Sequence, residues 1–186
     1  MRQLVKITVL ICVLYDVSRR MANKPLFYSI LFYRARDLVE SDLIQLTPEM
    51  AEPNDAKFIL TAIDVFTRKL WAEMVVSKAA RHVVPKFEKI LHEMTDGPSG
   101  RIPSVILTDL GLEFKNKQFL TLLENHKVRL VHNFTSYKAS HVERVQKTIQ
   151  DKIYSYVTSR GNLKFADRLQ EFVEGYNSSF HRTIQM

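Results

Sequence analysis

Hydrophobic and polar positions along the first half of the chain follow the spacing expected of strands. Residues 57–76 are rich in Ile, Val, Thr, Phe and Trp, and the polar segment 64–69 interrupts them as a hairpin connection would. A shorter run of the same kind, residues 40–46, precedes them. These runs predict three consecutive strands that pair as an antiparallel meander.

The pattern then becomes helical. Ser77 is suited to cap a helix that carries apolar residues on one face and closes before the Gly-Pro-Ser-Gly segment 97–100. Pro85 lies inside this helix, where it either kinks the helix or marks its first turn.

The remaining chain alternates between the two kinds of element and then stays helical. Strands are predicted at 102–107 and 128–131, with a helix between them at 117–125, and two further helices at 139–157, ended by Gly161, and at 165–176. The full order is three strands, a helix, a strand, a helix, a strand and two helices. Such an order predicts an α/β domain.

The basic composition of the chain favours binding to polyanions. The 186 residues leave room for one domain with a sizeable core, and a hydrophobic fraction of 46% with 25% charged residues is ordinary for a globular protein. The net charge of +7 favours nucleic-acid partners, although many basic proteins bind none. Cys12 is the single cysteine, which excludes an intramolecular disulfide and a cysteine-rich zinc site.

The first part of the chain differs from the rest. Residues 1–36 are expected to form an N-terminal extension, and residues 37–186 the domain. The extension opens with basic residues and an apolar run too short to cross a bilayer as a helix, which resembles the core of a signal peptide. Residues 16–20 supply no small-x-small cleavage pattern, so secretion is not expected and a buried strand or an appended segment is preferred.

Three carboxylates lie where they can converge on folding. Asp109 directly follows an apolar strand and precedes Gly111, as ligands do at the carboxyl edge of an α/β sheet, although an Asx-turn would use the same residue. Glu143 opens a helix, and Ser140 and Glu143 also fit a capping box. Asp42 lies in the first strand. Three such groups can hold two hard divalent cations over a phosphodiester, which is the chemistry of cutting and joining nucleic-acid strands.

These residues belong to a series of motifs in a fixed order. The series is Ser41-Asp42-Leu43-Ile44, the run 58–68, Trp71-Ala72, Ser77-Lys78, Thr108-Asp109-x-Gly111-x-Glu113-Phe114, Lys138-Ala139-Ser140-x-Val142-Glu143-Arg144 and the tail 176–184. From about residue 38 to residue 186, the chain thereby resembles the integrase catalytic core of retroelements and of Maverick/Polinton-type transposons. The resemblance implies a ribonuclease H-like fold, in which helices flank a mixed five-stranded sheet.

The resemblance also implies an active site. In it, Asp42 bridges two Mg²⁺ ions, for which Mn²⁺ can substitute, while Asp109 holds one ion and Glu143 the other. The implied reaction is trimming of an element's DNA end, followed by joining of that end to target DNA.

Three basic residues are expected to contact DNA beside this site. Lys138 and Arg144 flank it, and Lys147 lies one helical turn after Glu143, where a plain Glu–Lys surface pair is the alternative. The expected partners are DNA ends, target DNA and further copies of the chain, with no membrane and no small-molecule substrate. The expected location is the nucleus if the source is eukaryotic, and otherwise the cell interior.

Nearby acidic residues are assigned other roles. Asp64 is expected to be structural, pairing near Arg68 at the hairpin, and Glu113 to be a hydrogen-bonding support. Asp37 and Glu40 are expected to be a solvated flank of Asp42.

The chain departs from the family pattern at several positions. Leu110 and Leu112 replace polar residues around Gly111, and Gln146 stands where the family has an Asn that helps to order the site. A second hypothesis therefore remains, a domesticated and catalytically degenerate domain that binds nucleic acid or protein. A third is a ribonuclease H-like nuclease with another substrate, which requires a fourth late carboxylate, and the candidates for it are Asp167, Glu171 and Glu174.

Overall fold

A computed structural model describes residues 34–96, 100–132, 140–181 and 184, with only the backbone of Ser140. The predicted N-terminal extension, residues 1–36, therefore lies almost wholly outside the described residues, and Lys138 lies outside them. No helix in the described part of the chain is long and apolar enough to cross a membrane.

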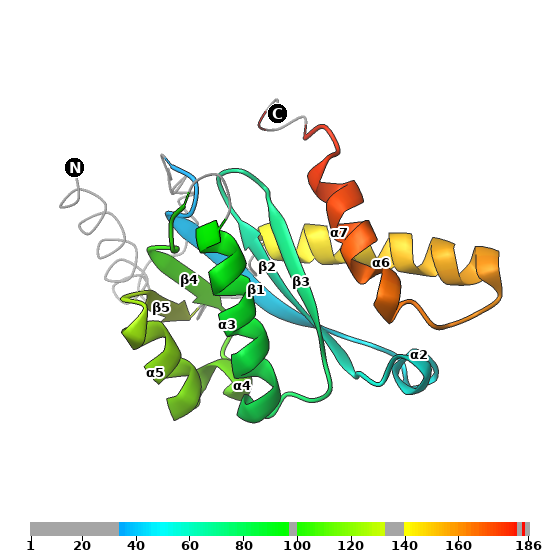
Figure 1. Cartoon of the computed structure of the whole chain (residues 1–186), viewed down its shortest axis with the longest axis horizontal. Coiled ribbons are helices and arrows are strands. Elements are labelled where there is room, and N and C mark those ends of the chain that lie inside the picture. The colour runs from blue at the N-terminus through cyan, green and yellow to red at the C-terminus, as the bar shows by residue number, and fades with distance from the viewer. Residues whose placement is uncertain (1–33, 97–99, 133–139, 182–183, 185–186) are drawn as a thin grey trace, which may run out of the picture. The chain divides into compact units, whose positions relative to one another are not determined.

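A five-stranded mixed sheet forms the centre of the fold (Figure 1). The strands are β1 (Leu38–Gln45), β2 (Phe58–Asp64), β3 (Leu70–Val75), β4 (Val105–Thr108) and β5 (Arg129–His132), in the spatial order β3-β2-β1-β4-β5. The first three pair antiparallel, and β4 pairs in parallel with both β1 and β5. The predicted meander and the predicted fold class are confirmed.

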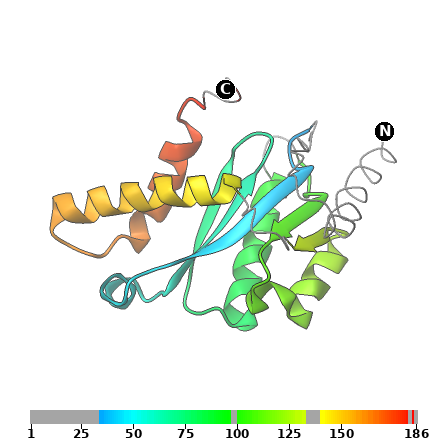
Figure 2. The ribbon, with the colours of Figure 1, turned by 180° about the vertical axis from the view of Figure 1, so that it is seen from behind.

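Helices cover both faces of the sheet. They are α2 (Pro48–Ala51), α3 (Ala80–Asp96), α4 (Leu112–Lys115), α5 (Lys117–Asn125), α6 (Ser140–Arg160) and α7 (Leu169–Asn177), with short 3₁₀ turns η2 (Glu52–Asn54) and η3 (Ala166–Arg168). Figures 1 and 2, which view the sheet from opposite sides, place α3, α4 and α5 over one face and α6 and α7 over the other.

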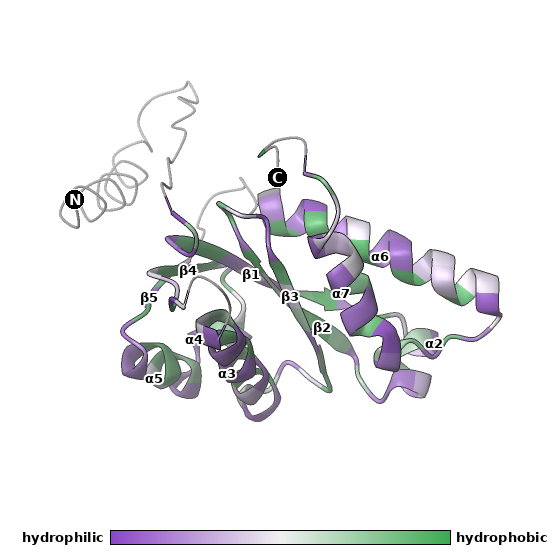
Figure 3. Cartoon of the chain, turned by 45° about the horizontal axis from the view of Figure 1, so that its top comes forward, coloured by the Kyte–Doolittle hydropathy of each residue, from purple (hydrophilic) through white to green (hydrophobic). Residues whose placement is uncertain are grey.

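Each face of the sheet has its own apolar core, because alternate strand residues point to opposite sides. On β1, Val39 packs with the core under α3 and α5, whereas Ile44 packs with the core under α6 and α7. Figure 3 shows the same division by hydropathy, with green strands between helices whose outer sides are purple. The face under α6 is also the face on which Glu40 and Asp42 lie, since they alternate in step with Ile44.

The buried amide of Asn54 ties two distant turns together. Its side-chain nitrogen donates to the carbonyl groups of Met50 and Leu163 at 2.6 and 2.8 Å, and its side-chain oxygen accepts from the amides of Phe165 and Ala166 at 2.7 and 2.8 Å. All four hydrogen-bonding positions of the side chain are therefore used. Asn54 fixes the connection between α6 and α7 against the β1–β2 connection.

Some element boundaries differ from the prediction. The helix after β3 begins at Ala80 and not directly after Ser77, whose hydroxyl instead accepts from the Ala79 amide and bonds to the ring of His82. Pro85 lies inside α3, beyond its first turn. The strand predicted from residue 102 pairs only from Val105 onward, since Pro103 has no N–H to donate to a ladder.

Asp37 was predicted to be solvated, and this is wrong. Its side chain is buried, and a carboxylate oxygen lies 3.5 Å from Nη2 of Arg101. The neighbouring Arg36 is buried too, and its guanidinium donates to the Arg101 carbonyl at 3.0 Å. The segment before β4 covers both residues, which the local sequence gives no means to anticipate.

Candidate active site

Asp42 lies at the middle of β1, on the face covered by α6. Its side chain is half-buried, and its Oδ1 accepts from the Leu43 amide at 2.7 Å. The strand is central in the sheet, with β2 on one side and β4 on the other. Asp42 is thereby held on the central strand of the sheet.

The end of β4 brings Asp109 beside Asp42. The parallel register pairs Glu40 with Leu107, so two residues further along the two strands Asp42 and Asp109 are neighbours. Asp109 is exposed, and its Oδ1 accepts from the Gly111 amide at 3.0 Å, which makes the Asx-type turn considered from the sequence. A turn of this kind leaves the second carboxylate oxygen available to a ligand.

The two carboxylates interact electrostatically. Burial raises the pKa of Asp42, and the nearby charge of Asp109 raises it further, while hydrogen bonds from the Leu43 amide and the Gln146 side chain, together with the charge of Lys78, lower it. Two like charges at a partly dry position are unfavourable on their own. A bound divalent cation would relieve this repulsion, so the pair fits a hard metal ion.

Glu143 lies in the first turn of α6, and its side chain is half-buried. The helix docks on the sheet through Val142 and Val145, which belong to the core on this face. The capping-box alternative for Glu143 requires the side chain of Ser140, which lies outside the described residues.

Glu40 holds the start of α6, and the prediction that it is solvated is wrong. Its carboxylate is buried, with Oε2 accepting from the amides of His141 and Val142 at 3.1 and 3.0 Å and Oε1 lying 2.8 Å from Nδ1 of His141. A helix start presents unpaired N–H groups and a partial positive charge, both of which stabilise a carboxylate there. The partners of Glu40 are about a hundred residues away in sequence, so no local pattern indicates them.

Gln146 orders the strand that carries Asp42. Its Nε2 donates to the Thr61 hydroxyl at 3.1 Å, and that hydroxyl donates to the Asp42 carbonyl at 2.9 Å. Gln146 also donates a hydrogen bond that lowers the pKa of Asp42. The position at which Gln146 replaces the Asn of the family pattern therefore still carries an amide directed at Asp42.

A second polar cluster supports the turn after Asp109. Glu113 is buried, and one of its carboxylate oxygens lies 3.0 Å from Nζ of Lys78, whose ammonium is also 5.4 Å from the centre of the Phe58 ring. Gly111 lies between the carboxylates of Glu113 and Asp109. Glu113 thus makes the supporting contact predicted for it.

The three predicted metal ligands are not all gathered. Among the residues that the structure describes, no three or more His, Cys, Asp or Glu side chains are close enough together to hold a metal ion. The fold brings Asp42 and Asp109 together and sets the first turn of α6 against the same strand. The ligand role of each residue stays a prediction.

No protein-family model matches the chain. A transposon-derived protein of Caenorhabditis elegans is 31% identical over 127 residues, which cover 68% of this chain and 43% of that protein. Among solved structures, the integrase catalytic core domain of HTLV-2 in complex with magnesium, in its trimeric form, matches with a TM-score of 0.60 at 13% identity, covering 81% of this chain and 91% of that one. The chain has the fold of an integrase catalytic core.

Two further structures agree on the fold. The dimeric form of the same HTLV-2 domain matches this integrase-like chain with a TM-score of 0.59 at 14% identity, covering 74% and 83% of the two chains. A chain from the simian T-cell lymphotropic virus intasome in complex with PP2A regulatory subunit B56 gamma matches at 0.61 and 16% identity, covering 74% and 47%. These matches confirm the ribonuclease H-like fold. The chain spans less than half the length of its transposon-derived relative.

Basic residues lie on the exposed side of α6 in the integrase-like fold. Arg144 and Lys147, two of the predicted DNA contacts, are exposed on this helix. Arg68 lies in the β2–β3 turn close to Arg144, and its Nη1 is buried with no hydrogen-bond partner in the described structure. Burial lowers the pKa of Arg68, the charge of Glu40 raises it, and the charge of Arg144 lowers it.

Asp64 is structural, as predicted. Its Oδ1 accepts from the Phe66 amide at 3.1 Å, its Oδ2 accepts from the Thr67 hydroxyl at 2.7 Å, and its carbonyl accepts from the Arg68 amide at 2.8 Å. These bonds close the β2–β3 turn, so the carboxylate is not available to the candidate site.

Leu110 and Leu112 follow Asp109, on either side of Gly111, and both are exposed, Leu112 to 82% of its surface.

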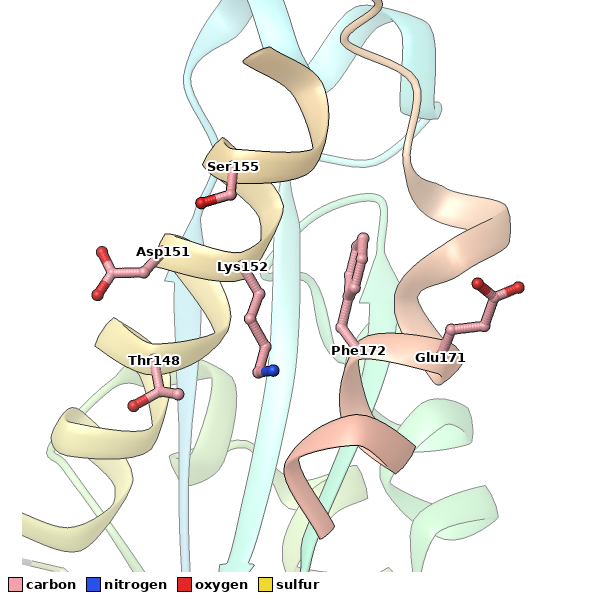
Figure 4. A pocket seen from close by; sticks show the side chains of 6 residues that line it. All are labelled: Thr148, Asp151, Lys152, Ser155, Glu171 and Phe172. Carbon is pink, nitrogen blue, oxygen red and sulfur yellow. The ribbon is translucent and has the colours of Figure 1, made fainter. Parts of the chain in front are cut away.

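A hollow of about 400 Å³ lies elsewhere, between α6 and α7. Figure 4 shows Lys152 of α6 and Phe172 of α7 facing each other across it, with Asp151 directed away. None of the three predicted metal ligands lines this hollow, so we assign the hollow no catalytic role.

Proposed function

We propose that this integrase-like domain carries out metal-dependent phosphoryl transfer on DNA, trimming the ends of an element and joining them to target DNA. One observation carries the proposal: the central strand and its parallel neighbour bring Asp42 and Asp109 together beneath the start of the helix that carries Glu143. The sequence relative is transposon-derived, and the integrase core of HTLV-2, which shares the fold, is described in complex with magnesium.

Each acid has an assigned part in the proposal. Asp42, Asp109 and Glu143 would hold the Mg²⁺ ions, which supply an activated nucleophile and stabilise the leaving oxygen. Gln146 and the Leu43 amide keep the Asp42 carboxylate directed, and the Gly111 amide does the same for Asp109. The closing of Glu143 onto the other two acids would accompany metal binding, because a cation offsets the repulsion that separates carboxylates.

DNA would be held by charge outside this cluster. Arg144 and Lys147 are exposed on α6, where their side chains can meet phosphates without sequence preference. Lys138 is proposed as a third contact from its sequence position. We further propose that the domain acts as a homo-oligomer, and in the nucleus if its source is eukaryotic; the integrase cores that share its fold are described in dimeric and trimeric forms.

A second function is favoured by a specific observation, the apolar surroundings of Asp109. Leu110 and Leu112 are exposed beside the acids, where charged substrates would approach. A catalytically degenerate domain that binds nucleic acid or protein would tolerate such a change.

Strand transfer on DNA that mimics an element end, or its reversal on a branched DNA, tests the first function in Mg²⁺ and in Mn²⁺. Asp109→Asn and Glu143→Gln should each abolish product formation. Glu124→Gln is the matched control, because Glu124 is exposed on α5, away from the acids. An inactive parent chain that still binds DNA in a salt-sensitive way would favour the degenerate module instead.

A further inference from the structure

The carboxylate of Glu40 joins the strand of Asp42 to the helix of Glu143. Glu40 stands two residues before Asp42, and its partner His141 stands two residues before Glu143. The joint consists of two backbone hydrogen bonds, at 3.1 and 3.0 Å, and the contact of 2.8 Å with the His141 ring. Few covalent bonds separate this joint from either predicted ligand.

The spacing on each side of the joint restricts where the ligands can move. In a strand, residues two apart point to the same face, at roughly 7 Å from each other, so Glu40 and Asp42 both face α6. In a helix, the amides of residues 141 and 142 belong to the same turn as Glu143. The Glu40 bonds therefore fix the backbone of Glu143 relative to the backbone of Asp42.

The joint depends on the two acceptor oxygens of Glu40. Its side chain is only 5% exposed, so both oxygens need partners within the protein. Oε2 has two amide donors at the positive end of α6, and Oε1 has the imidazole. Leu at this position would fill a similar volume and offer no acceptor, so the two amides and the ring would all lose their partner.

We propose that Glu40 and His141 are positioning residues of the acid site, which hold the backbone of Glu143 at a preset place relative to Asp42 and Asp109, so that only the Glu143 side chain has to turn when metal arrives. Neither residue touches the reacting atoms in this proposal. The inference rests on the proposed function, since it assigns a purpose to the placement of the same three acids.

Two measurements on the whole chain test the joint without any activity assay. Hydrogen exchange reports the protection of the His141 and Val142 amides, and the fraction of free Mn²⁺ seen by electron paramagnetic resonance reports metal binding. Glu40→Leu should lose protection at both amides and bind Mn²⁺ about tenfold or more weakly, which is the range for residues that orient metal ligands. Glu73→Leu is the matched control: Glu73 is similarly buried but pairs with Lys86 and Lys89, away from α6.

His141 variants separate positioning from folding. His141→Ala should weaken Mn²⁺ binding several-fold, while His141→Asn should restore it to within about twofold of the parent, because the Asn amide nitrogen can take the place of Nδ1. In strand transfer, the loss should fall on kcat with little change in the KM for DNA. A general loss of fold would also lower the apparent kcat, because it removes active protein, but it would lower Tm as well and would not be rescued by Asn.

The outcomes distinguish this inference from the proposed function. Mn²⁺ binding that weakens in Glu40→Leu, in a chain that never joins DNA, upholds the joint and refutes the function. Strand transfer and Mn²⁺ affinity that stay unchanged in Glu40→Leu overturn the joint and leave the function standing. A parent chain that binds no Mn²⁺ overturns both.

Discussion

Replacing Gly111 with alanine should disturb the turn that supports Asp109. A methyl group there would lie 2.6 Å from Cδ and 2.7 Å from Oε2 of Glu113, and 2.9 Å from Oδ1 of Asp109. These distances are shorter than any ordinary contact of a methyl group. The backbone itself, with φ at −57° and ψ at 140°, accepts alanine without strain, so the destabilisation comes from the two side chains.

The size of the effect follows from what Glu113 must give up. Its carboxylate is buried and has to move away from the new methyl group, which breaks or lengthens the 3.0 Å contact with Lys78. Because Lys78 is half-exposed, water replaces part of that contact, and we expect a loss of about 1–3 kcal/mol in the free energy of unfolding. For a domain of this size, that corresponds to a fall in Tm of roughly 2–12 °C.

Thermal unfolding followed by circular dichroism measures this loss, with Gly175→Ala as the control. Gly175 lies within α7, and its nearest neighbour to an added methyl group, Nζ of Lys152, is 4.0 Å away, so the methyl group fits. Alanine is the better helix former, and the control should gain about 0.5–1 kcal/mol. Equal changes in the two variants, or a Gly111→Ala protein as stable as the parent, would refute the close packing described around Asp109.

Three other substitutions have expected outcomes. Because burial raises the pKa of Asp42, the fold favours its neutral form, and ionised Asp42 lowers stability at neutral pH. Asp42→Asn should therefore raise Tm at pH 7 in metal-free buffer, and this gain should disappear as the pH falls below the ordinary pKa of aspartate. A variant less stable than the parent at pH 7 would contradict this. Asn54→Ala removes four hydrogen bonds from a buried position and should cost on the order of 3 kcal/mol in urea unfolding, whereas an unchanged midpoint would show that the turns hold without it. Gly161→Ala forces a side chain onto a φ of +61° and should cost about 1 kcal/mol, measured in the same way, and no cost would mean that the end of α6 adopts another backbone.

The sequence predicts the regular elements well where their periodicity is long. The β-meander is visible because residues 57–76 form two apolar runs around a polar turn, and the bounds predicted for α5 match those observed. Single-turn helices such as α2 and α4 were missed, because four residues are too few to show a helical period. The last predicted helix, residues 165–176, is instead a 3₁₀ turn, η3, followed directly by α7.

The candidate site is only partly readable from the sequence. That Asp42 and Asp109 approach each other follows from two strands that run in parallel, which the order of elements indicates. The burial of Glu40 and the contact of Gln146 with Thr61 do not follow, because both depend on how a distant helix settles on the sheet. A carboxylate on a strand is normally exposed. The Glu40 side chain is buried because the start of α6 covers it and binds it. The metal roles of Asp42, Asp109 and Glu143 stay predictions.

The Glu40 contact has a consequence for how the protein is made. During synthesis, the meander that carries Glu40 emerges first, and the amides that bind its carboxylate follow 101 and 102 residues later. Until then the carboxylate has only water as its partner, and the nascent sheet keeps this face open. We therefore expect chains stalled on the ribosome before residue 140 to expose that face to chaperones and proteases, and the start of α6 to dock on β1 only late in folding.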